Sequence, residues 1–332
     1  MLPEYAPGAR NAVRTCLDIG AGDHVAIVDD RGRADIAEAV AEEALSAGAA
    51  VRRLTMEDWT QRPALQFPSP LRSAIVEFQP TASFFIGDGL PGELGFRHPL
   101  LELVRELRLR HGHMIGITHE LMVDGMAGDY EEVYRVTRQV HVIVRGARAI
   151  EVRTALGTDL RATFNEAWRW IPSDGRYHEA GRWGNLPEGE VFTAPRTLDG
   201  VLVGEEMGDA FASRYGLFEQ PVRLEIEASR VRSVRMPGHP RIVEEIEGYL
   251  GQHPESNRAG EFAIGTNVGL RRIVGNFLQD EKFPGSHVAF GDPYGEETGA
   301  DWSAPSHVDV LASRADIWVD GRQLMREGKL LA

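Results

Sequence analysis

The sequence predicts an α/β fold in two domains, a parallel α/β domain followed by a mostly antiparallel α+β domain. Two observations predict it. Helical and strand patterns alternate from residue 1 to about 120, which is typical of a parallel sheet covered by helices. Beyond about residue 145, short β-branched segments predominate, and these are typical of antiparallel hairpins. The 332 residues suffice for two hydrophobic cores, and we place the domains at residues 1–145 and 146–332.

In the first domain, each of four helical patterns is followed by a strand pattern. The helical patterns lie at residues 9–19, 34–49, 70–78 and 99–112, and the strand patterns at 24–30, 50–56, 81–89 and 113–119. Glycines end the first two helical patterns at Gly20 and Gly48, as is common at helix C-termini. A last helix is expected at 129–144. This order predicts a flavodoxin-like domain, which we expect to frame the functional site and to take part in oligomerisation.

The second domain begins with a hairpin. It is expected over residues 148–164, with its turn at Gly157. Further strand patterns lie at residues 189–205, 221–236 and 315–325. The one clear helical pattern, at 239–253, follows the Pro-Gly pair at 237–238. We expect this domain to carry the catalytic residues.

Charge and cysteine content exclude several classes of protein. The formal net charge of −14 disfavours binding to a nucleic-acid backbone or to an anionic membrane surface. Cys16 is the only cysteine, so no internal disulfide can form. The sequence shows neither a secretion signal nor an apolar run long enough to span a bilayer. We therefore expect a cytoplasmic protein without nucleic-acid or membrane partners.

Side chains suited to metal binding and hydrolysis are concentrated near the C-terminus. Six of them fall within about fifty residues: Glu261, Glu281, His287, Tyr294, His307 and Asp309. Imidazole and carboxylate groups bind transition metals. His307 and Asp309 are two residues apart, so on a strand both would point to one face and could share an ion. The alternative is a half-exposed strand with polar residues facing water.

Other candidate residues also have ordinary structural interpretations. Glu261 and Glu190 each begin an apolar strand pattern, and a carboxylate buried there is costly unless it is paired or bound to metal. Either residue could instead lie at a solvated loop edge. His287 lies between apolar residues and could be a hydrogen-bonded core histidine. Glu281 could be a surface acid, and Tyr294 a loop aromatic.

The order of these motifs resembles one family. The segments GEVFTAP (189–195), GEFAIGTN (260–267), DEK (280–282), SHVAFG (286–291) and SHVDV (306–310) together resemble the aminopeptidase T, AmpS and PepS family, family 29 of the metallopeptidases, in a short variant. In that family a tyrosine also follows the first histidine, which matches Tyr294. The family pattern has asparagine where this chain has Lys282.

The resemblance implies a two-metal site. It implies that two divalent ions (Zn, Co or Mn) are bound by Glu190, Glu261, His287, His307 and Asp309. It further implies that Glu281 is the general base and that the Tyr294 hydroxyl stabilises an oxyanion. We therefore expect a metallo-aminopeptidase that hydrolyses the N-terminal peptide or amide bond of a small substrate. The resemblance also implies a homodimer.

Three alternatives are kept. The same ligand set would serve an amidohydrolase of small non-peptide molecules. A second alternative is a mononuclear Fe(II) ring-cleaving dioxygenase related to dihydroxypyridine dioxygenase, in which two histidines and one aspartate hold the iron. In those enzymes the resemblance puts a histidine at the position of Glu261 and an apolar residue at that of Glu190, so both glutamates favour the hydrolase. The third alternative is a non-catalytic assembly or binding protein.

Overall fold

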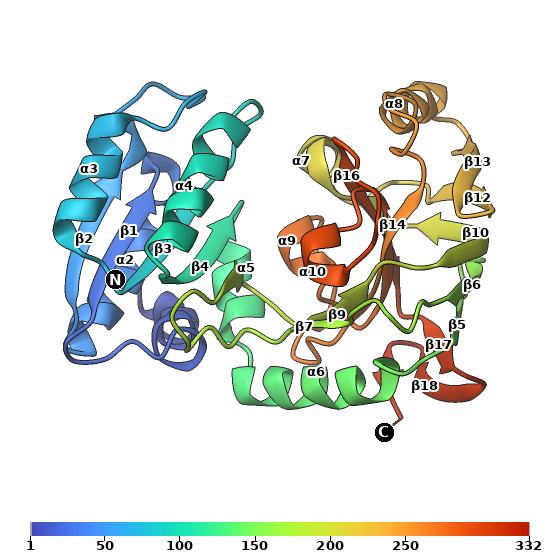
Figure 1. Ribbon diagram of the computed structural model, residues 1–332, viewed down its shortest axis with the longest axis horizontal. Coiled ribbons are helices and arrows are strands. Elements are labelled where there is room, and N and C mark those ends of the chain that lie inside the picture. The colour runs from blue at the N-terminus through green and yellow to red at the C-terminus, as the bar shows by residue number, and fades with distance from the viewer. Residues whose placement is uncertain (1, 332) are drawn as a thin grey trace. The chain divides into compact units, whose positions relative to one another are not determined.

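The computed structural model describes residues 2–331 and divides them into two compact units (Figure 1). The first unit contains the residues up to 134 together with 175–188, and the second contains 135–174 and the residues from 189 onward. The expected boundary was a single one, at residues 145 and 146. Residues 135–145 therefore fold with the second unit and not with the first, as was expected from the single boundary. Residues 175–188 fold with the first unit and not with the second. In residues 2–331, every helix is either too short or too polar to cross a membrane.

The first unit is a parallel sheet of five strands in the order β2-β1-β3-β4-β8. Its strands are β1 (His24–Asp29), β2 (Ala50–Thr55), β3 (Ala82–Gly87), β4 (Arg110–Ile115) and β8 (Trp183–Asn185). The fifth strand explains why residues 175–188 belong here, since β8 pairs with β4 across about seventy residues of sequence. The parallel α/β fold class is confirmed for this unit.

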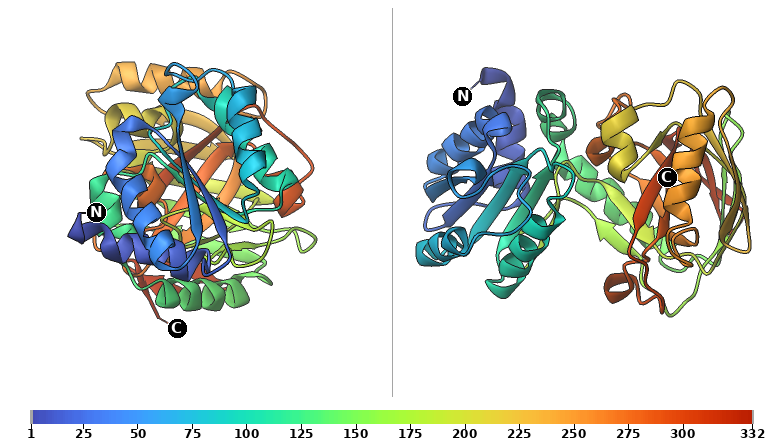
Figure 2. Two further views of the ribbon diagram at one scale, coloured as in Figure 1. Left: turned by 90° about the vertical axis from the view of Figure 1, so that its left-hand side faces the viewer. Right: turned by 90° about the horizontal axis from the view of Figure 1, so that it is seen from above.

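Helices flank the parallel sheet (Figure 2). They are α1 (Ala6–Arg10), which continues as a π-helical turn (Asn11–Cys16), α2 (Ala34–Ser46), α3 (Ser69–Phe78), α4 (Leu94–Glu106) and α5 (His119–Val123). Apolar residues of α3 and α4 share one core with Val28, Leu54 and Phe85 of the sheet. Helix α2 packs against strands β1 and β2 and against α1. The helix expected at 99–112 begins earlier, at Leu94, and strand β4 begins three residues before the expected start.

The second unit contains two antiparallel sheets. One has eight strands in the order β13-β12-β10-β6-β5-β17-β18-β19. These are β5 (Ala149–Arg153), β6 (Asp159–Thr163), β10 (Thr197–Gly204), β12 (Val222–Glu227), β13 (Arg230–Arg235), β17 (Asp316–Val319), β18 (Arg322–Arg326) and β19 (Lys329–Leu330). The expected hairpin at Gly157 is confirmed, because β5 pairs antiparallel with β6.

The second sheet of this unit has six strands in the order β11-β16-β15-β14-β9-β7. They are β7 (Ile171–Ser173), β9 (Glu190–Thr193), β11 (Glu206–Met207), β14 (Ala259–Gly265), β15 (Gly285–Gly291) and β16 (His307–Ser313). The unit's helices are α6 (Tyr130–Val144), α7 (Asp209–Tyr215), α8 (Pro240–Leu250), α9 (Phe277–Asp280) and α10 (Gly295–Thr298). The helix expected at 239–253 is confirmed as α8, and three short helices that were not predicted, α7, α9 and α10, accompany it.

One hydrophobic core lies between the two antiparallel sheets. It covers one face of the six-stranded sheet, so the functional side chains have to lie on the opposite face. Phe262 and Ile264 of β14 belong to this core, as do Val288 of β15 and Val310 of β16. Residues of α6, including Val140, also belong to it, so most of this helix folds with the second unit. Because side chains alternate along a strand, the residues between these positions point to the opposite face of the sheet.

Phe262 provides a test of this core. Its side chain is fully buried and makes edge-on contacts with Phe164 and Trp170. We expect Phe262→Ala to lower the free energy of unfolding of the second unit by about 3–5 kcal/mol, because the lost ring leaves a cavity. Denaturant unfolding followed by circular dichroism measures the change. The control is Val142→Ala on α6, where the side chain is 59% exposed and the expected change is within about 0.5 kcal/mol. Equal losses in the two variants would contradict the assignment of the core.

Candidate metal centre

Four neighbouring strands of the six-stranded sheet place the candidate ligands on one face. Glu190 begins β9, Glu261 lies in β14, His287 in β15, and His307 and Asp309 in β16. In the register of the sheet, Ala289 is directly opposite both Glu261 and Asp309. Residues directly opposite in an antiparallel pair share a face, so the two carboxylates flank a small methyl group that leaves space between them. Alternation in each strand therefore gathers residues that are far apart in the sequence.

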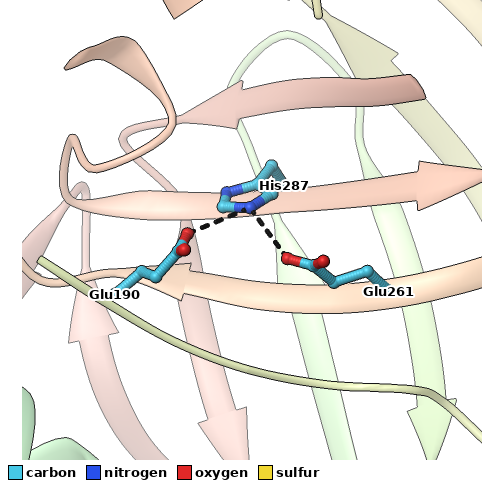
Figure 3. Close-up of side chains that lie close together, drawn as sticks. All are labelled: Glu190, Glu261 and His287. Atoms are coloured by element: carbon cyan, nitrogen blue, oxygen red, sulfur yellow. Dashed lines mark ion pairs between the residues drawn. The ribbon is translucent and has the colours of Figure 1, made fainter. Parts of the chain in front are cut away.

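The first group of donors consists of Glu190, Glu261 and His287 (Figure 3). The Nε2 atom of His287 lies 3.3 Å from Oε2 of Glu190 and 3.3 Å from Oε1 of Glu261. The three ligand atoms all lie within 4.8 Å of one another. This spacing is compatible with all three residues binding a single ion, since metal–ligand bonds are about 2.0–2.2 Å long.

The second group of donors consists of Glu261, His307 and Asp309. Here Nε2 of His307 lies 3.6 Å from Oε2 of Glu261 and 3.5 Å from Oδ2 of Asp309. Glu261 thus turns one carboxylate oxygen toward each histidine. These distances would allow two ions to be held side by side, with Glu261 contributing one oxygen to each.

The cluster of donor groups carries an excess of buried negative charge. Glu190, Glu261 and Asp309 are each less than 10% exposed. Oε2 of Glu190 is buried without a hydrogen-bond partner in the described part of the chain. Burial opposes the charged form of histidine, yet the surrounding carboxylates raise the pKa of His287 to about 9 and that of His307 to about 10. A site that attracts protons this strongly also fits divalent cations, and its imidazole and carboxylate donors suit Zn, Co or Mn.

The two histidines differ in the hydrogen bond that their second ring nitrogen, Nδ1, can make. Nδ1 of His307 lies 2.9 Å from the backbone carbonyl of Asp292, so its N–H can donate there and leave Nε2 free for a metal. Nδ1 of His287 is buried and has no hydrogen-bond partner among residues 2–331. Only His307 therefore has the kind of support that fixes the tautomer of a metal ligand.

Glu281 and Tyr294 lie at the edge of this cluster. Glu281 follows α9, and its carboxylate forms a third donor group with His287 and Asp309. It is not the fully solvated acid of the alternative interpretation. Burial, opposed by the charge of Lys282, raises its pKa to about 8. Tyr294 is 42% exposed, and its ring centroid is 4.5 Å from that of His307.

Lys282 was not predicted as a site residue. Its side chain is 1% exposed, and Nζ lies 2.7 Å from both Oε1 of Glu190 and Oε1 of Glu281. One sequence signal could have found it, because the chain contains only two lysines among its 36 basic residues. The structure thus brings all seven predicted residues together and adds a buried ammonium. Their roles as ligands, base and oxyanion donor stay predictions.

Glu206 and Asp280 were also missed. Glu206 is fully buried, and its carboxyl group lies beside that of Asp280, with which it shares a hydrogen bond. Asp280 accepts hydrogen bonds from the backbone N–H groups of residues 274–276. Burial, and next the charge of Asp280, raise the pKa of Glu206 to about 10. Its two-residue strand β11 is too short to be recognised from an alternating pattern.

Comparison with known proteins connects this chain to enzymes of two classes. The family model described as 2,5-dihydroxypyridine 5,6-dioxygenase matches residues 116–253. A curated 2,5-dihydroxypyridine 5,6-dioxygenase of Pseudomonas putida (strain KT2440) is 22% identical over 211 residues, which are 61% of this chain and 59% of that protein. The alignment thus spans less than two thirds of the relative's length. Of the predicted site residues, only Glu190 lies within the range of the family model.

Solved structures of both classes share the fold. The structure of 2,5-dihydroxypyridine dioxygenase from Pseudomonas putida KT2440 superposes with a TM-score of 0.71 at 17% identity, covering 99% of this chain and 97% of that one. Wild-type AmpT from Thermus thermophilus superposes with a TM-score of 0.72 at 19% identity, covering 99% of each chain. These likenesses show the fold and confirm its class. An enzyme is supported, but the comparisons do not confirm membership of the peptidase family.

The buried Glu206, on the strand β11 that pairs with β16, provides a pH test of the surroundings of the centre. An unfolded glutamate loses its proton near pH 4.5, whereas the folded Glu206 keeps it to about pH 10. Folding is therefore progressively disfavoured as pH rises between these values, by at most about 1.4 kcal/mol per pH unit. We expect Glu206→Gln to raise the melting temperature relative to wild type by an amount that grows from pH 5 to pH 9. The control is Glu227→Gln, at a side chain that is 79% exposed, and thermal unfolding at pH 5, 7 and 9 measures both. A difference that is constant with pH would show that Glu206 is ionised in the folded protein.

Proposed function

We propose that this protein is a metal-dependent hydrolase that cleaves the N-terminal peptide or amide bond of a small substrate. The observation that carries the proposal is the position of Glu261, which turns one oxygen toward His287 and the other toward His307. Two ion positions bridged by one carboxylate are a common basis for hydrolysis by two metals. The remaining ligands would be Glu190 at one position and Asp309 at the other.

The residues of the chain can perform the proton transfers of such a reaction. When bound, divalent ions at these donors supply a water of lowered pKa and polarise the substrate carbonyl. Glu281 is placed beside this cluster and takes the proton of the attacking water, then delivers it to the leaving amine. Without the ions, burial raises its pKa to about 8, and bound divalent cations would lower that pKa and favour the carboxylate form that accepts the proton. The Tyr294 hydroxyl donates a hydrogen bond to the developing oxyanion, a contribution typically worth a few kcal/mol.

The second candidate is a ring-cleaving dioxygenase, and the sequence comparisons favour it over the hydrolase. Both the family model and the curated relative carry the name 2,5-dihydroxypyridine 5,6-dioxygenase. Non-haem Fe(II) oxygenases hold iron with two histidines and one carboxylate. In this chain, each donor group found among residues 2–331 contains one histidine and two carboxylates. We give the donor geometry more weight because Glu261, His287, His307 and Asp309 all lie beyond the range of the family model.

One pair of assays separates the two candidates. Apoprotein is reloaded with Zn, Co or Mn and given a panel of amino-acyl amides, and a second portion is reloaded with Fe(II) and given 2,5-dihydroxypyridine in air. We expect release of amine in the first assay and no consumption of oxygen above the protein-free rate in the second. Oxygen uptake coupled to loss of the pyridine, without amide cleavage, would establish the dioxygenase instead.

The role of Glu281 is tested by Glu281→Gln. The amide cannot accept the proton, so we expect kcat for amide cleavage to fall by about 10²–10⁴-fold, with metal still bound. Stopped assays measure kcat, and elemental analysis measures the metal. Glu296→Gln on α10, at an exposed position, is the control and should retain activity. Wild-type turnover by Glu281→Gln would exclude Glu281 as the base.

A further inference from the structure

Lys282 is a fixed positive charge inside the donor cluster. Its ammonium is buried and lies 2.7 Å from Oε1 of Glu190 and 2.7 Å from Oε1 of Glu281. The only other lysine in the chain, Lys329, is exposed on β19. Burying a lysine is costly unless carboxylates pair with it, and here its partners are a candidate metal ligand and the candidate base. The position of this charge therefore bears on metal binding.

The charge of Lys282 acts directly on the first ion position, that of Glu190, Glu261 and His287. Glu190 shares its carboxylate between two cations there, because Oε1 pairs with Lys282 while Oε2 faces His287. Only one oxygen of Glu190 is left for a metal. An ammonium a few ångströms from a divalent ion also repels it, and in the partly screened interior of a protein this lowers affinity by at least about a hundredfold.

A second difference between the two ion positions also predicts weaker metal binding at the first. At the other position, that of Glu261, His307 and Asp309, the histidine is oriented by the carbonyl of Asp292. At the first position, Nδ1 of His287 has no such partner within the described chain. Loss of an outer partner of this kind typically costs about 10–100-fold in metal affinity.

We propose that Lys282 makes the two metal positions unequal: the ion at Glu261, His307 and Asp309 is resident, and the ion at Glu190, Glu261 and His287 is weakly held and exchangeable. This inference rests on the two-ion centre of the proposed function. When the first position is vacant, the ammonium of Lys282 itself balances the charge of Glu190 and Glu281. The protein would then be purified with one ion and would take up the second from solution as the free metal concentration rises.

The test is a metal titration that needs no turnover. Apoprotein is titrated with Co²⁺ by calorimetry and by the visible absorption of the ion. For wild type we expect two binding steps whose Kd values differ by at least about a hundredfold. In Lys282→Gln and Lys282→Met the weaker step should tighten by at least about tenfold, because the repelling charge is gone. Lys282→Arg keeps the charge and should keep the gap, and Lys329→Gln is the matched control.

Each outcome decides the proposal. Two steps of equal affinity in wild type overturn it, as does a gap that is unchanged in both neutral variants with native circular dichroism. One equivalent in wild type and two in Lys282→Gln support it, whereas one equivalent in both overturns it. Should the neutral variants fail to fold, the wild-type titration still decides between equal and unequal sites. Unequal binding without amide cleavage would refute the proposed function alone, and equal binding with cleavage would refute only this inference.

Discussion

The clustering of buried carboxylates on one face of the six-stranded sheet is the main electrostatic constraint on the second unit. Glu190, Glu261, Glu281 and Asp309 are brought together where little water reaches them, and such a group cannot remain ionised without cations nearby. In the structure, a buried lysine and two histidines that readily accept protons balance part of this negative charge. A bound metal ion would balance this negative charge more completely. The same carboxylates and histidines would then determine both the charge of the site and its metal ligands.

Strand periodicity is the reason that the sequence already contained most of the site. His307 and Asp309 share a face because they are two residues apart on β16, and Phe262 and Glu261 point to opposite faces because they are adjacent on β14. A carboxylate within an apolar run was therefore a meaningful signal. The alternation of helices and strands predicted the parallel sheet for the same reason, since it depends on local patterns that recur along the chain.

Features that depend on long-range contacts could not be predicted in this way. Strand β8 has only three residues, Trp183-Gly184-Asn185, and it is a strand because β4 offers a free edge. The burial of Lys282 is equally invisible in the local segment Asp280-Glu281-Lys282, which looks like a solvated charge cluster. Its partner Glu190 lies 92 positions away. The fold does not select between the two classes of enzyme, because solved structures of both share it.

The position of β8 has a consequence for how the protein is made. The chain passes between the two units three times, near residues 134, 174 and 188. Neither unit is therefore a continuous stretch of polypeptide. During synthesis, the parallel sheet cannot be completed until Asn185 has left the ribosome, when the residues of β5 and β6 in the other unit have already been synthesised. A gene fragment ending at residue 145 would encode a sheet with its last edge uncovered, and unpaired strand edges invite association between chains.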